Sequence, residues 1–249
     1  MPLYGQLELA PIAARLARLR DLDTEAWSLP RAEILQLACE VGDETRDLLP
    51  RAMHPAVPPY ATWVVVSYPE SPIGPFKLAQ LRLMGRAGAH PRGYVLGAIA
   101  STPAAVTALR ERWGFPAELG AIAIRRYHDR VMAEVAREGQ PILEAALVDP
   151  ELISGADIQY IHSVTLATAP DGESTAPRLV QVDPHYVFHK AERGRPALGR
   201  FDRPAWNAAC LSPLHPMSAS FATCDTDLPR IRFVMDAELP VIQGTRRIR

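Results

Sequence analysis

The sequence predicts a single, mainly β domain with a few short helices packed outside it. Short apolar segments recur along the chain between turn residues, and several of them alternate or are rich in β-branched residues. The 24 prolines suit a protein of many short strands and corners. No internal repeat or linker divides the 249 residues, which are enough to bury a substantial core.

The expected strands combine period-two alternation with continuous apolar character. Residues 61–67 (ATWVVVS) are strongly β-branched, and residues 77–84 (KLAQLRLM) alternate cleanly. Residues 158–169 and 178–189 flank a polar turn, which indicates a long hairpin. The other expected strands are residues 32–41, 94–100, 121–124, 130–136, 143–148, 221–225 and 230–236.

Three segments have helical character. Residues 7–20 carry apolar side chains at helical spacing, so we expect an amphipathic N-terminal helix, within an extension (residues 1–24) to a domain of residues 25–249. A short helix is expected after Asp43. A third helix should begin after Thr102, a good N-cap, and end at Gly114, where a left-handed residue is favoured. The basic tail of residues 243–249 is expected to be loose.

Charge and composition narrow the possible partners. The formal net charge of -1 gives no overall attraction to nucleic acid or to an anionic membrane. The longest apolar runs are shorter than the ~20 residues of a membrane span, and the N-terminus lacks a secretory signal. Cys39, Cys210 and Cys224 are few, odd in number and without metal-ligand spacing. We therefore expect a cytoplasmic protein that binds neither nucleic acid nor membrane.

Common catalytic motifs are absent from the sequence. It contains no phosphate-binding glycine loop, no HExxH and no GxSxG. On one strand, His185 and His189 would lie about 13 Å apart, too far to share a metal. We therefore expect no metal and no organic cofactor. Gln181 and Asp183 share the same strand face, and they are polar binding candidates if that face lines a cavity.

Two motifs and the end of the domain occur in a defined order. YPESPIGPF (residues 68–76) precedes TPAAVTALRERWGFPAELG (102–120), and AWNAACLSPLHPMSASFATCDTDLPRIRFVMD (205–236) follows. This arrangement resembles the acetoacetate decarboxylase superfamily over roughly residues 25–238. The resemblance implies a closed, cone-shaped antiparallel β sheet with outer helices, and a homo-oligomer.

The resemblance also implies a loss of the family's chemistry. Family decarboxylases form a Schiff base between a lysine and a β-keto acid. The position of that lysine is Ala117 here, and the neighbouring cationic position is Glu118. Two acidic pocket positions fall on Leu78 and Trp63, whereas the pocket arginine is retained as Arg31. Because Ala117 carries no amine, the covalent route is closed.

Two interpretations of this change remain open. In the first, the cavity serves non-covalent chemistry on a larger, more apolar ligand, with Arg31 holding a carboxylate or enolate oxygen and Glu118 acting as a general acid or base. Gly97 would add room and Gln181 a polar contact. The apolar wall would consist of Trp63, Phe76, Leu78, Phe115 and Ala117.

In the second interpretation these residues are ordinary structure. Trp63 and Leu78 would be core, Glu118 a solvent-facing turn residue and Arg31 half of a structural ion pair, in a protein that only binds an apolar carboxylic acid. We favour a lysine-independent enzyme of natural-product biosynthesis that cyclises, rearranges or isomerises a polyketide-type β-dicarbonyl intermediate in an apolar pocket of the β barrel. Decarboxylase, aldolase or dehydratase activity on a β-keto acid is the alternative among enzymes.

Overall fold

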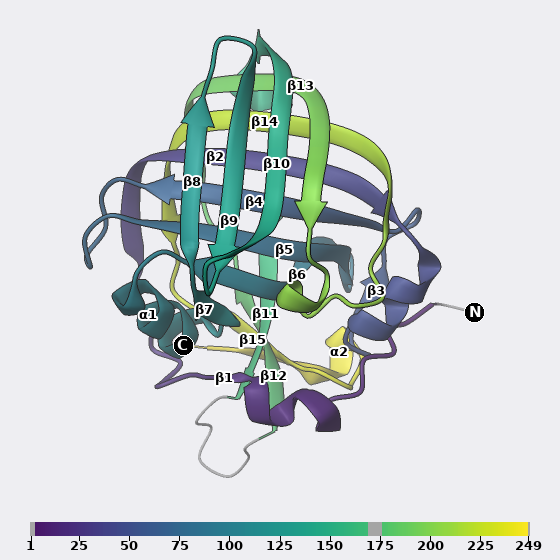
Figure 1. The fold of residues 1–249 in the computed structure, drawn as a ribbon. Helices are drawn as coiled ribbons and strands as arrows, with labels where there is room; N and C mark the ends of the chain where they lie inside the picture. Colours follow the sequence, from purple (N-terminus) through teal and green to yellow (C-terminus); the bar gives the residue numbers. More distant parts are fainter. Residues whose placement is uncertain (1–2, 169–175, 249) are drawn as a thin grey trace.

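One continuous, strongly curved sheet dominates the fold (Figure 1). A computed structural model describes residues 3–168 and 176–248. The strands are β1 (Ala17–Arg18), β2 (Trp27–Val41), β3 (His54–Pro55), β4 (Tyr60–Tyr68), β5 (Phe76–Ala87), β6 (His90–Ala100), β7 (Ala117–Leu119), β8 (Ala121–Arg126), β9 (Arg130–Arg137), β10 (Gln140–Ile153), β11 (Ser163–Thr168), β12 (Pro177–Val182), β13 (Tyr186–Phe201), β14 (Pro213–Leu228), β15 (Phe233–Asp236) and β16 (Thr245–Arg247).

The sheet is mainly antiparallel and curls back on itself. The hydrogen-bonded order is β16-β15-β12-β11-β6-β5-β4-β2-β14-β13-β10-β9-β8, and the short strands β1, β3 and β7 pair with β11, β5 and β6. β8 packs against β6 without ladder hydrogen bonds between them. The predicted mainly β class is therefore confirmed, and the cone is closed by packing rather than by a complete ring of hydrogen bonds.

Helix α1 (Pro103–Trp113) confirms the prediction for the central motif. The Thr102 side chain accepts a hydrogen bond from the Ala105 N–H at 3.2 Å, and Gly114 ends the helix with a left-handed φ of 69°. The helix packs over β6 and β7 (Figure 1) and buries Leu109 and Trp113. The chain then enters β7 through Phe115 and Pro116, which fixes the position of Ala117.

The predicted N-terminal helix over residues 7–20 is wrong. Only Ala10–Arg15 is helical, as a 3₁₀ helix with Pro11 in its first turn. Leu16 is already extended, and β1 then pairs in parallel with β11, so that Leu19 N–H donates to the Thr168 carbonyl at 2.9 Å. The sheet satisfies the backbone groups that a longer helix would have paired. The other 3₁₀ helices are Asp43–Leu48, Gly155–Asp157 and Pro204–Trp206.

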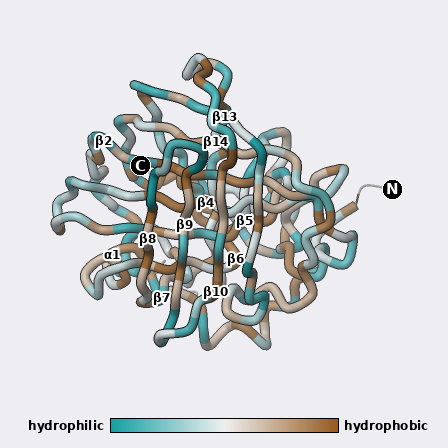
Figure 2. Tube along the Cα trace, turned by 45° about the horizontal axis from the view of Figure 1, so that its top comes forward, coloured by the Kyte–Doolittle hydropathy of each residue, from teal (hydrophilic) through white to brown (hydrophobic). Residues whose placement is uncertain are grey.

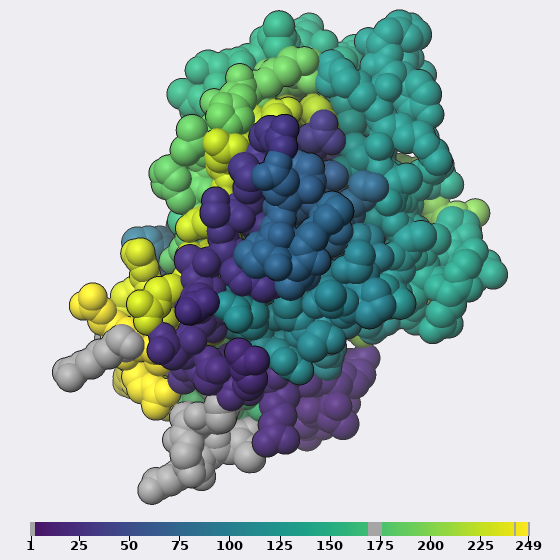
Figure 3. All heavy atoms as spheres, turned by 90° about the vertical axis from the view of Figure 1, so that its left-hand side faces the viewer, coloured from purple at the N-terminus to yellow at the C-terminus, as the bar shows by residue number. Residues whose placement is uncertain are grey.

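The C-terminal tail is more ordered than expected. Helix α2 (Val241–Gly244) leads into β16, which pairs with β15. The N-terminal and C-terminal segments meet at the surface (Figure 3), where Arg230 and Asp23 form an ion pair of 2.5 Å. β11 and β12 form the predicted hairpin, although its turn, residues 170–177, lies almost entirely outside the described residues. None of the helices in the described residues is long and apolar enough to cross a membrane.

The sheet carries an apolar core on each face. The central strands are largely hydrophobic (Figure 2), because successive side chains point to opposite faces and both faces are buried. In β4, Trp63 and Val65 belong to the first core, which faces β8, β9 and β10. Val64 and Val66 belong to the second core, which is covered by α1, β1 and the β11–β12 hairpin. Strand parity therefore decides which side chains can meet at a site.

Candidate functional site

A narrow inner chamber lies within the second core. Its free space is about 20 Å³, room for about one water molecule. The walls are apolar in part, and an unusual number of polar side chains also face inward. The lining residues are Ile34, Gln36, Val64, Val66, Tyr68, Gln80, Arg82, Phe115, Tyr160, Ser163, Val182, Pro184, Tyr186, Thr226, Asp227 and Leu228.

Arg82 is the most unusual of these residues because its guanidinium is almost completely buried, with 7% of the residue exposed. It lies on β5, two residues after Gln80, so both side chains face the chamber. Its Nε donates to Gln80 Oε1 at 2.6 Å and its Nη1 donates to the Ile161 carbonyl at 3.1 Å. No carboxylate among the described residues forms an ion pair with it. Burial lowers the pKa of Arg82, and the nearby Tyr186 and Tyr68 oppose that shift.

Three tyrosines supply the chamber with protonated hydroxyl groups. Burial raises the pKa of Tyr68 and Tyr160, and it raises that of Tyr186 to about 12. The rings of Tyr160 and Tyr186 meet edge to face with centroids 5.2 Å apart. At neutral pH all three phenols therefore remain hydrogen-bond donors.

Two further polar groups line the same chamber. Thr226 Oγ1 is buried and has no hydrogen-bond partner among the described residues. Asp227 is half-buried, and its Oδ1 accepts a hydrogen bond from the His185 N–H at 2.6 Å. The chamber thus combines one cation, several neutral donors and one carboxylate. Such a set can bind an anionic oxygen and transfer a proton.

One of the sequence-predicted residues lines this chamber, and three others belong to the core around it. Phe115 is the lining residue. Phe76, Leu78 and Ala117 belong to the same buried core, and Ala117 is 1% exposed. β7 places Ala117 beside β6, where it pairs with Ala98. The position at which the resemblance implies a lysine is therefore a buried methyl group in the second core.

Three other predicted binding residues lie away from the chamber. Trp63 is fully buried in the first core, where its ring meets Phe201 edge to face at 5.1 Å. Gln181 precedes Val182 on β12 and contacts Met235 on the opposite face, with Nε2 3.5 Å from the sulfur. Gly97 does not add room, because a Cβ there would lie 3.0 Å from the Trp206 carbonyl oxygen.

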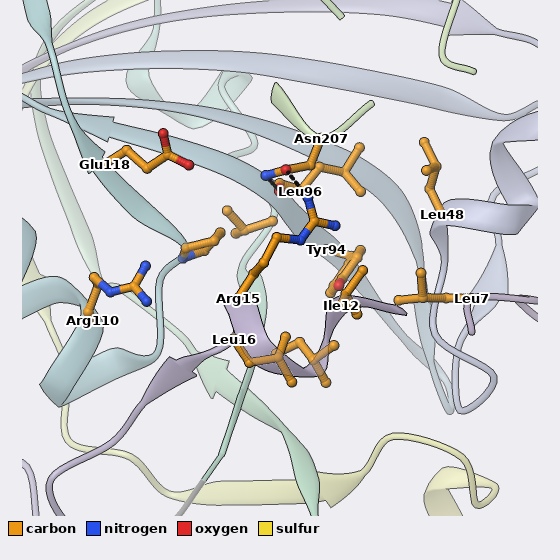
Figure 4. Close-up of a pocket in the computed structure, with 13 residues that line it drawn as sticks. Leu7, Ile12, Arg15, Leu16, Leu48, Tyr94, Leu96, Arg110, Glu118 and Asn207 are labelled. Carbon is orange, nitrogen blue, oxygen red and sulfur yellow. Dashed lines mark hydrogen bonds between the residues drawn. The ribbon is translucent and has the colours of Figure 1, made fainter. Parts of the chain in front are cut away.

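Glu118 lines a different hollow, a cleft with about 150 Å³ of free space (Figure 4). It follows Ala117 on β7, so strand alternation directs it to the other side. Its carboxylate pairs with Arg137 at 2.6 Å. Arg15 and Asn207 lie in the middle of the view, joined by a 2.9 Å hydrogen bond, and apolar residues form the rest of the wall: Leu7, Ile12, Leu16, Leu48, Tyr94, Val95, Leu96, Pro116 and Leu166.

Arg31 is not brought together with Glu118. It lies at an irregularity of β2 with a φ of 55°, and its N–H donates to Asp225 Oδ1 at 2.8 Å. Its side chain is 68% exposed and forms an ion pair with Glu70. Neither the chamber nor the cleft includes Arg31 among its lining residues.

The chain contains only two lysines, Lys77 and Lys190. Lys77 lies between Phe76 and Leu78 on β5, so strand alternation turns it away from the second core. Lys190 is half-exposed on β13 and pairs with Glu192 at 3.3 Å. Neither lysine lines the chamber. In the described part of the chain, no group of three or more His, Cys, Asp or Glu is placed to hold a metal ion.

Sequence reasoning missed the polar groups of the chamber. One signal was available, since Leu78, Gln80 and Arg82 alternate in KLAQLRLM and must share one face of a buried strand. An arginine on an otherwise buried face is unusual enough to mark a site. No local signal links Tyr160 or Tyr186 to that face, because they reach it only through the tertiary fold.

Known structures share this architecture. Acetoacetate decarboxylase from Legionella pneumophila subsp. pneumophila str. Philadelphia 1 is 17% identical, with 84% of this chain and 86% of that chain covered and a TM-score of 0.74. The enduracididine biosynthesis enzyme MppR, complexed with the condensation product of pyruvate and imidazole 4-carboxaldehyde, is 17% identical, with 99% and 97% covered and a TM-score of 0.66. An acetoacetate decarboxylase-like enzyme from Sphingomonas wittichii RW1 is 16% identical, with 87% and 94% covered and a TM-score of 0.63.

The fold is therefore that of the acetoacetate decarboxylase-like enzymes. The sequence model of the family described as acetoacetate decarboxylase matches residues 21–237, most of the chain. The chain belongs to the acetoacetate decarboxylase family. No curated protein matches the sequence.

Proposed function

We propose that this family member is a lysine-independent enzyme of natural-product biosynthesis. It cyclises, rearranges or isomerises a short, polyketide-type β-dicarbonyl substrate in the inner chamber. One observation carries the proposal: neither of the two lysines, Lys77 and Lys190, lines the chamber. The resemblance puts the buried Ala117 at the position of the Schiff-base lysine, which also favours chemistry through non-covalent contacts.

The polar groups of the chamber suit proton transfer at an enolisable carbon. Asp227 can accept a proton from the carbon between two carbonyl groups, and the electron pair then moves onto a carbonyl oxygen. Protonated Tyr160 and Tyr186 can donate hydrogen bonds to that oxygen. The enolate carbon can attack a third, more distant carbonyl of the same molecule, whose oxygen takes up the proton from Asp227. Val64, Val66 and Phe115 limit the conformations of the substrate.

The neighbours support this class of reaction. MppR is named as an enzyme of enduracididine biosynthesis, and its structures contain pyruvate or a condensation product of pyruvate. Small carbonyl compounds and their carbon–carbon bond chemistry are therefore within the range of this fold. The chamber does not support the larger ligand expected from the sequence, since its free space of about 20 Å³ admits about one water molecule. A short substrate therefore requires the lining side chains to move apart when it enters.

The cleft of Figure 4 favours one alternative, binding of an apolar carboxylic acid without turnover. Arg15 and Arg110 reach this apolar cleft, and their hydrogen bonds go to neutral acceptors, Asn207 Oδ1 and the Ala117 carbonyl. A carboxylate could pair with either guanidinium while its chain lies along Leu7 and Ile12. Recovery of the ligand in an unaltered form would favour this alternative, whereas an isomeric product would exclude it.

Borohydride trapping tests the lysine-independent reaction. The protein is incubated with acetoacetate or pyruvate and sodium borohydride, digested and analysed by mass spectrometry. We expect no stable adduct on Lys77 or Lys190. A reduced adduct on either lysine that depends on the keto acid would overturn the proposal, because it would show an imine at an amine we place outside the chamber.

A further inference from the structure

Arg82 is a buried cation that the described protein leaves without a counter-ion. A guanidinium in a dry interior is unfavourable unless an anion or several good hydrogen bonds accompany it. Its two hydrogen bonds to described residues go to neutral oxygens, Gln80 Oε1 and the Ile161 carbonyl. These occupy Nε and Nη1, so part of the donor fork remains available toward the chamber.

A second buried arginine nearby, in contrast to Arg82, forms an ion pair with an acid. Arg92, whose side chain is 10% exposed, pairs with Asp183 at 3.3 Å. Asp183 Oδ1 also lies 3.5 Å from His162 Nδ1. The guanidinium of Arg92 thus has an acidic partner within the protein. Among the described residues Arg82 forms no ion pair with an acid, and the carboxylate of the chamber, Asp227, accepts a hydrogen bond from the His185 N–H instead. The lack of an acidic partner is therefore specific to Arg82 and is not shared by Arg92.

The chamber holds other donors that suit the same anion. Thr226 Oγ1 is buried and unbonded among the described residues, and it lines the chamber together with Arg82. Tyr186 lies opposite Thr226 on the neighbouring strand, and it lines the chamber together with Arg82. A cation and two hydroxyl groups thus converge on a space too small for an extended ligand.

We propose that Arg82, with Thr226, forms the anion subsite of the chamber and binds the anionic oxygen of a small keto compound. The anionic oxygen is the carboxylate of a β-keto acid or the enolate of a β-dicarbonyl. This inference rests on the proposed function, since it places the substrate in the same chamber. Gln80 is a positioning residue that holds the guanidinium toward the ligand through its 2.6 Å hydrogen bond.

The test measures binding of two probes by isothermal titration calorimetry. Acetoacetate carries a carboxylate, and acetylacetone offers only an enolate oxygen. We expect at least one probe to bind the wild-type protein and Arg82→Met to weaken it about 10- to 100-fold, the range for loss of a charge-assisted hydrogen bond. Arg82→Lys keeps the charge but loses the planar fork, so its affinity should lie between the two.

The two probes also show whether the subsite binds a carboxylate or an enolate oxygen. Preferential binding of acetoacetate assigns the subsite to a carboxylate, whereas binding of acetylacetone with increased enolate absorption assigns it to an enolate. Arg195→Met is the matched control, because Arg195 is 75% exposed and pairs with Asp149 on the outer surface. This variant should bind like the wild type, and the thermal unfolding of every variant is recorded to confirm folding.

Two results would overturn the inference. One is an unchanged affinity in folded Arg82→Met and Arg82→Lys proteins. The other is no binding of either probe to the wild-type protein at millimolar concentration. Both leave the lysine-independent reaction standing, whereas a borohydride adduct would remove that reaction without affecting a measured dependence on Arg82.

Discussion

At the scale of single residues, Ala117 is the position at which the resemblance implies the lysine of the family. Its side chain is a methyl group in the second core, 1% exposed, and held by the pairing of β7 with β6. A lysine introduced there would extend from this core into an apolar environment. Burial would lower the pKa of its amine, because desolvation disfavours the ammonium form. A neutral amine is the form that attacks a carbonyl group.

We therefore predict that Ala117→Lys restores imine formation. With acetoacetate and borohydride, this variant should gain a mass increment on residue 117, while the wild type gains none. The longer side chain enters a narrow space, so we expect a loss of about 1–3 kcal/mol in the free energy of unfolding. A folded variant that forms no adduct would contradict the placement of residue 117 beside the bound keto acid.

Several single residues could be predicted from the sequence and others could not. The family motifs indicate Leu78 and Ala117 as pocket residues, and both are buried in the second core that contains the chamber. The resemblance also indicates Trp63, which lies in the first core, because successive residues of a strand point to opposite faces. Tyr160 and Tyr186 reach Arg82 from segments about 80 and 100 residues away, a contact that no local pattern encodes.

At the scale of elements, a buried acid links strands that are not neighbours. Arg126 on β8 donates two hydrogen bonds, of 2.5 and 2.7 Å, to Glu192 on β13, and β9 and β10 lie between these strands in the sheet. Glu192 is 3% exposed and also pairs with Lys190. Burial alone would raise the pKa of Glu192, but the hydrogen bonds from Arg126 and Lys190 outweigh it and lower the pKa.

This pair should make stability depend on pH. Because the pKa of Glu192 is lower in the folded state, its contribution is fully present above the ordinary glutamate pKa and is lost as the pH falls through the folded value. Arg126→Met should lower the free energy of unfolding by about 2 kcal/mol at pH 7, less than for a fully buried pair, since Arg126 is 42% exposed. Urea unfolding at pH 7 and at low pH measures both effects. Equal pH dependence in wild type and variant would contradict this role.

The elements with strong local signals were the ones predicted well. Helix α1 has a capping residue, an early proline and a glycine stop, and all three act as expected. The segment of residues 7–20 had the apolar spacing of a helix without a cap, and pairing of β1 with β11 outweighed that spacing. The long strands β13 and β14 were only partly predicted, because much of their length is exposed and polar.

At the scale of the whole molecule, the family motifs predicted the curved sheet but not how it closes. The two motifs lie in the β4–β5 turn and on α1 and β7, whereas the gap lies between β8 and β6. The two cores share the same strands, since β2, β4 and β5 contribute alternate residues to each. A homo-oligomer remains an expectation that light scattering can test against the 27.4 kDa chain.

Because the two cores share three central strands, we predict that they unfold together. Neither core can lose its packing without disrupting strands that support the other. The tryptophans provide separate probes, with Trp63 and Trp206 in the first core and Trp27 and Trp113 in the second. A variant in which Phe replaces Trp27 and Trp113 reports on the first core, and one in which Phe replaces Trp63 and Trp206 reports on the second.

In each variant the fluorescence transition should coincide with the loss of far-ultraviolet circular dichroism in urea. Trp113 donates a 2.7 Å hydrogen bond to the Pro229 carbonyl, so its replacement should lower the midpoint of unfolding without separating the two signals. A fluorescence transition that precedes the circular dichroism change in one variant would show that the corresponding core melts alone. The second core, which contains the inner chamber, would then be a unit whose stability is independent of the first core.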